Sequence, residues 1–386
     1  ENQLLTGNYR VEDSYILNAW QDAYQLINAA NNFISIVEEL PESAFGENRQ
    51  TEMLAEAKFL RAFAYSYLLK HYGYFWDINS EYGVILRLEP SAMSNNNMAR
   101  SSVEACYTQI LDDYQYAIDY GPDFYSRYRA CATTAKAFKA EMLMNRGAEG
   151  DYEEAIRLAD EVLGSSEFSM ATTYAEIFNS GYDCPELMFT RHISDEISIG
   201  DNVARTSTYL GEGRYQPSDL YYDFLPESDT RRATSLDSII VRETDDEKTL
   251  VYKKHLKADN NSPIYYMRLA QMHLIKAEAM AYLNEPTADI IEELNVLRRR
   301  SGNTELQAED YPTQESLLDE IFAESVREIS NENGTLFYFA VRYKKGSIRK
   351  LEELNSNYTS SNENQLCFPI PQSELEHNTL IEQRPL

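Results

Sequence analysis

One short segment combines two aromatic rings with a carboxylate and an amide. Tyr74 and Trp76 supply flat rings, and Asp77 and Asn79 supply planar polar groups. A sugar presents apolar C–H faces beside many hydroxyls, so a sugar site needs aromatic platforms with polar partners next to them. These four residues are therefore a candidate ligand platform, with the alternative that Trp76 packs against the scaffold. The other tryptophan, Trp20, lies in a helical pattern and is expected in the core.

A second cluster of tyrosines surrounds an arginine and two glycines. Tyr209, Arg214 and Tyr215 are followed by Tyr221. Aromatic rings interleaved with a guanidinium suit a polar ligand such as a glycan or a peptide carboxylate. Packing within a loop is the alternative for the same residues. The Gly-Glu-Gly-Arg run is not predicted to bind phosphate, because the lysine and the strand-to-helix setting of a phosphate loop are absent.

The sequence contains no catalytic or metal-binding motif. HExxH, GxSxG and DxDxDG patterns are absent, and the five histidines and four cysteines are scattered without metal-ligand spacing. We therefore expect a protein that is not an enzyme and has no cofactor and no metal-ligand residues, and the sequence leaves open whether a metal ion supports the loops. A glycosidase pair among the 63 acidic residues is defined by its separation in space, which a sequence does not give. An all-α glycoside hydrolase is thus kept as an alternative.

The charge of the chain excludes one class of partner. The 386 residues include 35 Lys and Arg against 63 Asp and Glu, a net charge of −28. A surface this acidic repels phosphate backbones, so we expect no nucleic-acid partner. No run of about 18 apolar residues is present, so no membrane-spanning helix is predicted. Because residue 1 is Glu1 rather than Met, we expect a processed or truncated product, whose leader or lipid-bearing cysteine would lie upstream.

A one-sided helix precedes the first aromatic segment. Apolar residues recur at intervals of three and four from 51 to 72, and Gly73 ends the pattern. Trp76 therefore lies in a loop just past the end of a helix. A further helix is predicted from 102 to 120.

Two helix hairpins indicate the fold class. The first runs from 135 to 163, with a turn at 146–150, and the second runs from 265 to 302, with a turn at 284–286. Stacked pairs of this kind are typical of tetratricopeptide-like scaffolds. We predict a mostly α-helical fold built on such a scaffold.

The helical period fades in the middle of the chain. Between 169 and 261 the runs 187–190 and 238–241 are β-like and lie among loops. We predict one unit over residues 1–386, with a helical scaffold at 1–168 and 262–386. Residues 169–261 are predicted to form a loop-rich insertion with short strands, and such ordered loops are often functional.

Five groups of residues resemble, in the same order, the motifs of the SusD/RagB family of outer-membrane nutrient-binding lipoproteins. They are a W...Y..I..N pattern at 20–31, RAxxYxxLxxxYG at 61–73, R-S-x-x-E-x-Y at 100–107, the RLAExxLxxAEA and LNxLRxRSG pair at 268–279 and 294–302, and PIPxxE at 368–374 with Asn378 and Gln383. Three features depart from the family. Tyr74 follows Gly73 where the family usually has a proline nearby, a helix motif survives only in part at 324–334, and Arg384 replaces a final asparagine.

The resemblance implies a location, a partner and a role. It implies a surface-exposed lipoprotein of the cell outer membrane, whose lipid anchor is not part of this sequence. It also implies a SusC-like TonB-dependent transporter as partner, and ligand binding without catalysis. The place of Trp76 resembles that of a ligand-stacking tryptophan in sugar-binding relatives. We expect a glycan-binding subunit that captures oligosaccharide or polysaccharide for uptake, with a peptide-binding RagB-like subunit or a tetratricopeptide adaptor for proteins as alternatives.

Overall fold

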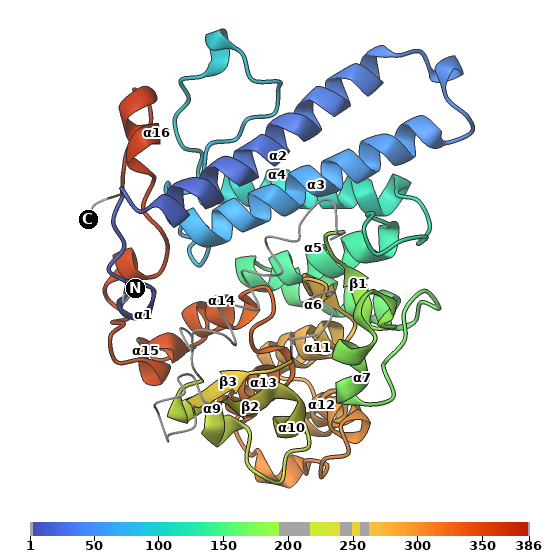
Figure 1. Cartoon of the computed structure of the whole chain (residues 1–386), viewed down its shortest axis with the longest axis vertical. Coiled ribbons are helices and arrows are strands. Elements are labelled where there is room, and N and C mark those ends of the chain that lie inside the picture. The colour runs from blue at the N-terminus through green and yellow to red at the C-terminus, as the bar shows by residue number, and fades with distance from the viewer. Residues whose placement is uncertain (1–2, 193–216, 240–248, 255–261, 385–386) are drawn as a thin grey trace. The chain divides into compact units, whose positions relative to one another are not determined.

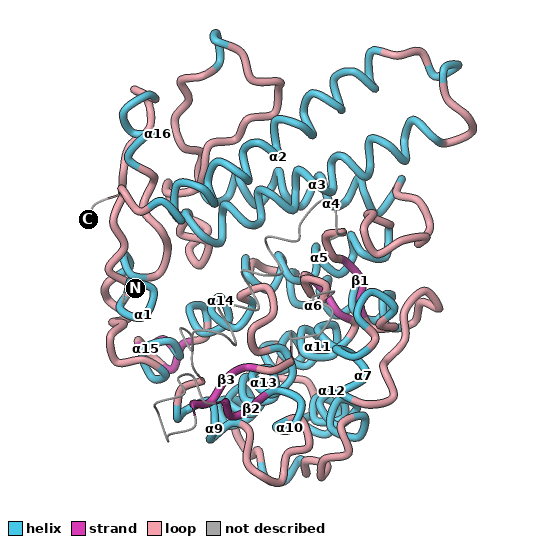
Figure 2. Tube along the Cα trace, in the orientation of Figure 1, coloured by secondary structure: helices cyan, strands magenta, loops and turns pink. Residues whose placement is uncertain are grey.

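The structure is a computed structural model that describes residues 3–192, 217–239, 249–254 and 262–384 (Figures 1 and 2). It divides into two compact units. The first comprises Glu1–Tyr125, Arg129–Leu158 and Phe337–Leu386, and the second comprises Ser126–Tyr128 and Ala159–Leu336. The mostly α-helical fold class is confirmed. This division differs from the predicted boundaries, because residues of the predicted insertion share a unit with helices of the predicted scaffold. The single-unit assignment and its boundaries stay predictions.

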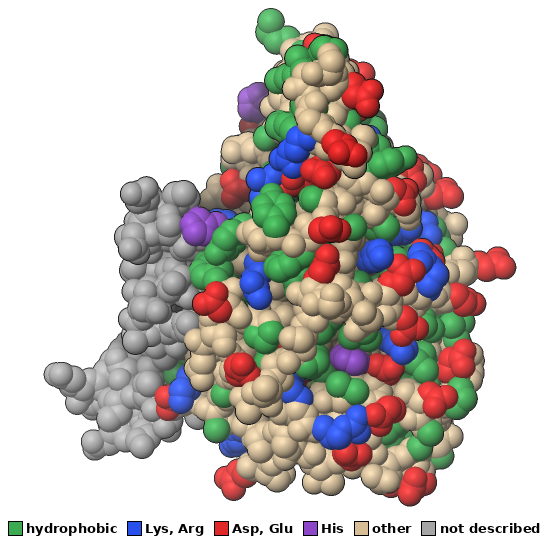
Figure 3. All heavy atoms as spheres, turned by 90° about the vertical axis from the view of Figure 1, so that its right-hand side faces the viewer, with side chains coloured by type: hydrophobic (Ala, Val, Ile, Leu, Met, Phe, Trp, Pro, Cys, Tyr) green, Lys and Arg blue, Asp and Glu red, His purple; other side chains and the backbone are tan. Residues whose placement is uncertain are grey.

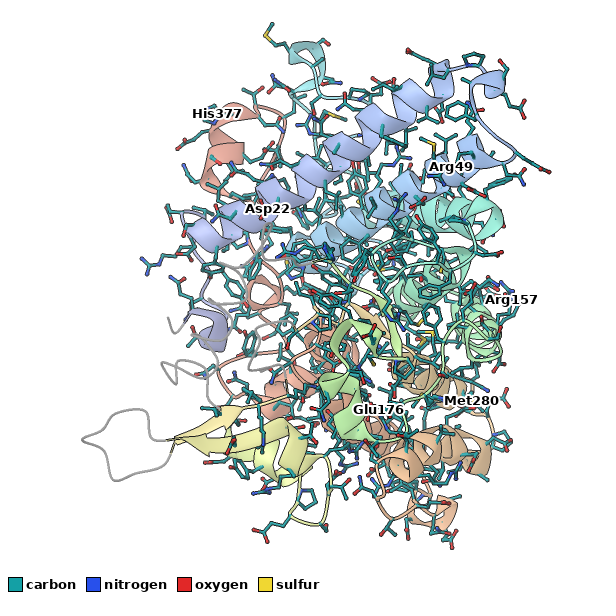
Figure 4. All side chains as sticks on the ribbon, turned by 45° about the vertical axis from the view of Figure 1, so that its right-hand side comes forward. Asp22, Arg49, Arg157, Glu176, Met280 and His377 are labelled. Atoms are coloured by element: carbon teal, nitrogen blue, oxygen red, sulfur yellow. The ribbon has the colours of Figure 1, made fainter. Side chains whose placement is uncertain are left out.

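The first unit is built on long helices. Its elements are α1 (Gln3–Thr6), α2 (Ser14–Glu39), α3 (Arg49–Tyr72), α4 (Val103–Tyr120), α5 (Ala132–Arg146), the first part of α6 (Asp151–Leu163), most of α14 (Thr335–Arg342), β5 (Lys344–Lys345), β6 (Ile348–Arg349), α15 (Lys350–Leu354) and α16 (Gln372–His377). Figure 1 shows α2 and α3 running side by side in opposite directions. Side chains fill the space between the helices, whereas Asp22 of α2 and His377 of α16 lie on the outside (Figure 4).

Helix α3 is the centre of this unit. Small residues such as Ala62 alternate with large ones such as Phe59 and Tyr65, and all three are fully buried. This alternation lets α2 and α4 pack closely against it. The fold confirms the predicted helices at 51–72 and 102–120, and Trp20 is buried in the core as expected.

A buried polar cluster fixes the register of three helices. The Arg61 guanidinium of α3 donates to both carboxylate oxygens of Asp113 on α4, at 2.8 Å each, and to Asn31 Oδ1 on α2 at 2.9 Å. A bidentate pair satisfies both planar groups at once, so the buried charge is compensated. Polar residues of the sequence motifs at 20–31 and 61–73 are therefore explained by packing.

The second unit contains the longer helices α11, α12 and α13 together with shorter helices and short strands. Its elements are the end of α6, α7 (Tyr174–Asn179), β1 (Leu187–Phe189), α9 (Asp219–Phe224), α10 (Arg232–Ser235), β2 (Leu236–Ile239), β3 (Thr249–Tyr252), β4 (Met267–Arg268), α11 (Ala270–Tyr282), α12 (Thr287–Arg300) and α13 (Gln314–Ile329). Strands β1 and β4 pair antiparallel, as do β2 and β3. Helix α11 packs against α12 and α13.

Fully buried ion pairs hold this unit together. Arg268 of β4 contacts Glu186 at 2.8 Å, Glu328 at 3.2 Å and Glu332 at 2.6 Å. Arg231 adds contacts to Glu324 at 2.6 Å and Glu328 at 3.4 Å. The side chains of these residues are at most 1% exposed. Such a network is stable only while every charge keeps its partners.

The element predictions hold with one correction. The hairpins at 135–163 and 265–302 correspond to α5 with α6 and α11 with α12, and β1 confirms the run 187–190. The predicted helix start at 265 is wrong, because residues 267 and 268 form β4 and α11 begins only at Ala270. Extended backbone there brings Arg268 to its buried carboxylates. The run 238–241 overlaps β2, and residues 240 and 241 lie outside the described residues.

Candidate functional site

Backbone hydrogen bonds join the two ends of the loop after α3 and attach this loop to the start of α4. The Tyr74 N–H donates to the Tyr82 carbonyl at 2.9 Å, and the Val103 N–H donates to the Ser80 carbonyl at 2.9 Å. Gly83 approaches the backbone of the α4 start so closely that a Cβ there would lie 2.8 Å from both Cys106 Sγ and the Ser102 carbonyl oxygen. These contacts hold Trp76 in a defined place.

Trp76 lies on a stack of aromatic rings. Its ring is half-buried and stacks on Tyr74, with centroids 4.8 Å apart and planes inclined by 25°. The Phe75 ring meets it edge-on at 5.3 Å. Tyr74 is only 7% exposed, and burial raises its pKa to about 12, so it stays neutral. Tyr74 therefore packs on the Trp76 ring, and Trp76 is the more exposed of the two residues.

The polar residues of this segment point to solvent. Asp77 and Asn79 are both exposed, and the Asn79 N–H donates to Asp77 Oδ1 at 3.1 Å. That bond closes a turn and leaves the second carboxylate oxygen and the amide side chain available. The structure thus brings Trp76, Asp77 and Asn79 together on one loop, backed by Tyr74.

Cationic side chains surround this loop. The guanidinium of Arg349 lies 5.3 Å from the centre of the Trp76 ring, that of Arg384 lies 5.9 Å from Tyr74, and that of Arg100 lies 5.4 Å from Tyr82. Arginine favours such ring contacts because its planar cation meets the negative face of the ring. The C-terminal segment that contains Arg384 is attached next to this loop, because the Phe368 N–H donates to the carbonyl of His71 near the end of α3 at 2.6 Å.

Sequence reasoning missed these three arginines as site residues. Arg100 and Arg384 lie in two of the family-like motifs, and the replacement of the final asparagine by Arg384 is a sequence signal for this position. Arg349 lies in no motif. Its approach to Trp76 depends on the hairpin of β5 and β6, which the sequence pattern does not indicate.

The second predicted cluster is not assembled in the described structure. Tyr209, Arg214 and Tyr215 lie outside the described residues. Tyr221 belongs to α9 and is 7% exposed, with its hydroxyl 2.6 Å from Ser330 Oγ and its ring 5.3 Å from that of Tyr252. Its contacts are those of a packed residue, and its role as a ligand-binding residue stays a prediction.

An open depression lies near Tyr221 in the second unit. Its volume is about 440 Å³, and its lining includes Tyr222, Glu227, Arg232 and Asp237. The Arg232 guanidinium lies 4.4 Å from the centre of the Tyr222 ring, which ties these two side chains to each other.

Metal ligands are not gathered in the part of the chain that is described. No group of three or more His, Cys, Asp and Glu side chains is placed there to hold an ion. The four cysteines are buried and form no disulfide. Acidic side chains are dispersed over the face shown in Figure 3, with Lys and Arg between them. Among the described helices, none combines the length and the apolarity needed to cross a membrane.

Two family models together match most of the chain. Residues 1–143 match a family model described as starch-binding and associating with the outer membrane, and residues 247–386 match the SusD family model. A SusD superfamily protein of Bacteroides vulgatus superposes with a TM-score of 0.81 at 18% identity, covering 99% of this chain and 87% of that one. A SusD-like carbohydrate binding protein of the same species has a TM-score of 0.76 at 19% identity, covering 94% and 83%.

The helix-pair fold and these superpositions define a SusD-type architecture. A SusD-like protein of Bacteroides ovatus is 24% identical over 343 residues, which is 74% of this chain and 59% of that protein. The chain belongs to the SusD/RagB family. It spans about three fifths of the length of two curated relatives, 59% of the Bacteroides ovatus protein and 63% of a SusD-like protein of Formosa agariphila.

Proposed function

We propose that this chain is a glycan-binding subunit that captures oligosaccharides at the cell surface, with the Trp76 loop as its platform. The observation that carries the proposal is a half-buried indole, stacked on a buried Tyr74 and held on a loop closed by backbone hydrogen bonds. The family descriptions of starch binding and carbohydrate binding support a sugar as the ligand class.

Each part of the loop has a role in this proposal. The exposed part of the Trp76 ring contacts the apolar face of a sugar ring, and its fixed orientation reduces the entropy lost on binding. The exposed Asp77 carboxylate and Asn79 amide bind hydroxyl groups beside that ring. Tyr74 keeps the indole from turning into the protein.

The proposal includes a transporter and a membrane anchor. Captured ligand would pass to a SusC-like TonB-dependent transporter of the outer membrane, and the chain would be attached there through a lipid anchor upstream of this sequence. The family model that describes association with the outer membrane supports this location. A pull-down with the cognate transporter at low salt tests the partnership, and recovery of no transporter would contradict it.

Affinity electrophoresis tests the binding function. At neutral pH a charge of −28 drives the free protein toward the anode, so retardation in gels containing a polysaccharide reports binding directly. We expect retardation by at least one polysaccharide of a broad panel, and no new reducing ends after long incubation. Retardation by none, together with binding to peptides, would favour a RagB-like peptide role, and released reducing ends would identify a hydrolase.

A further inference from the structure

The arginines near the Trp76 loop lack carboxylate partners. Arg349 is 3% exposed, its Nη1 donates to the Val341 carbonyl, and its buried Nε has no hydrogen-bond partner. Arg384, 2% exposed, donates to Asn364, to Cys367 and to the Phe368 carbonyl. Arg100 donates only to carbonyls, and its buried Nη1 has no partner. Within the described residues, none of the three has a carboxylate oxygen within 4.0 Å.

The other buried arginines of the described residues are compensated. Arg61 pairs with Asp113, and Arg231 and Arg268 each contact at least three carboxylates. A buried charge without a counter-ion costs several kcal/mol. A chain with 63 acidic residues has many carboxylates to place near these cations, yet the described structure places none in contact. The local excess of positive charge is therefore a specific property of this loop.

Lys344 adds an exposed cationic side chain to this group of arginines. It is exposed on β5 and lies opposite Arg349 of β6 in the antiparallel hairpin. Burial and the nearby Arg349 lower the pKa of Lys344, while Glu363 and Asp77 partly offset them. Because Arg349, the pairing partner of Lys344, has its guanidinium 5.3 Å from the centre of the Trp76 ring, the β5–β6 hairpin places Lys344 in the neighbourhood of the Trp76 loop. No carboxylate of the described residues is within ion-pair distance of its ammonium group.

We propose that the ligand of the Trp76 platform is an acidic glycan, whose carboxylate or sulfate group binds Lys344, with Arg349 providing positive charge beneath it. This inference rests on the proposed function and names its ligand class. The negative group would supply the counter-ion that the described protein does not place there. A net charge of −28 repels polyanions at long range, so binding of an acidic polymer requires such a local site.

Matched polysaccharide pairs test the charge requirement. Polygalacturonate is compared with its methyl ester, and dextran sulfate with dextran, by isothermal titration calorimetry at low and at 0.5 M salt. We expect one charged member to bind at least tenfold more tightly than its neutral partner, and added salt to weaken that binding. The pair that responds identifies the group as a carboxylate or a sulfate.

A neighbouring lysine provides the control variant. We expect Lys344→Gln to weaken binding of the charged member about fivefold to tenfold and to leave any binding of the neutral member unchanged. Lys345→Gln removes the same charge from the adjacent residue, whose ammonium group lies 3.7 Å from Glu353, and should change affinity less than twofold.

The outcomes separate this inference from the proposed function. Equal binding of charged and neutral members, or an unchanged affinity for Lys344→Gln, would overturn the acidic-glycan inference while glycan binding stands. Equal losses for Lys344→Gln and Lys345→Gln would also overturn it, because they indicate an effect of overall charge. Failure of the wild type to bind any polysaccharide of a broad panel would contradict the proposed function itself.

Discussion

Replacing Arg268 with methionine should destabilise the second unit strongly. The guanidinium contacts Glu186, Glu328 and Glu332 at 2.6–3.2 Å, and all of these side chains are at most 1% exposed. Methionine keeps much of the length but removes the charge. Because removing one partner of a buried ion pair costs about 3–5 kcal/mol, we expect a loss in that range for the free energy of unfolding.

Neighbouring cations reduce the loss of stability that Arg268→Met causes. Lys254 still contacts Glu332 at 2.8 Å, and Arg300 still contacts Glu186 at 2.8 Å, so part of the charge stays compensated. The matched control is Arg299→Met. Arg299 is 42% exposed and pairs with an exposed Glu292, so this change should cost less than about 0.5 kcal/mol.

Urea unfolding followed by circular dichroism measures both variants. Hydrogen exchange of amides in α11 and α13 assigns the loss to the second unit. A cost below about 1 kcal/mol for Arg268→Met, or a cost equal to that of Arg299→Met, would refute the conclusion that this network holds the unit together.

Three further predictions concern acid stability, a close backbone approach and the Trp76 loop. Burial alone would raise the pKa of Glu328, but Arg300, Arg268 and Arg231 outweigh it and hold that pKa at about 2, below its usual value of 4.5. The stabilisation is therefore complete above about pH 4.5 and is lost as the pH falls toward 2, so unfolding free energies that stay constant from pH 5 to 2 would contradict it. Gly83→Ala should lower the free energy of unfolding of the first unit by about 1–3 kcal/mol, and with it the melting temperature, because its Cβ would meet the backbone at the start of α4. Gly46→Ala should be nearly neutral, because a Cβ at Gly46 has open space around it. Asp77→Ala should weaken glycan binding about fivefold in titration calorimetry through the lost hydrogen bond, and equal losses for the exposed Asp22→Ala on α2 would argue against a direct contact.

Local sequence signals determined the helical part of the fold. The apolar spacing from 51 to 72 and the terminating Gly73 correspond to α3, and Ser102 caps α4 by accepting a hydrogen bond from the Ala105 N–H at 3.2 Å. Periodicity and capping act over a few residues, so they can be read without knowledge of the fold.

Long-range packing explains what the sequence did not predict. The start of α11 is displaced by β4, whose pairing with β1 joins residues about 80 positions apart. Arg349 reaches Trp76 through a hairpin that begins far along the chain. The Trp76 loop itself was predictable because Trp76, Asp77 and Asn79 are neighbours in sequence, whereas the cations around it come from three separate segments.

Affinity electrophoresis of Trp76→Ala tests the central claim most directly. The substitution leaves the charge of the protein unchanged, so its mobility in a gel without polysaccharide should equal that of the wild type. In the polysaccharide that retards the wild type, we expect Trp76→Ala to lose about tenfold in affinity, equivalent to about 1.4 kcal/mol of aromatic contact. Tyr120→Ala, which removes a 50% exposed ring from α4, should bind like the wild type. Wild-type retardation of a folded Trp76→Ala variant would show that the Trp76 loop is not the glycan platform.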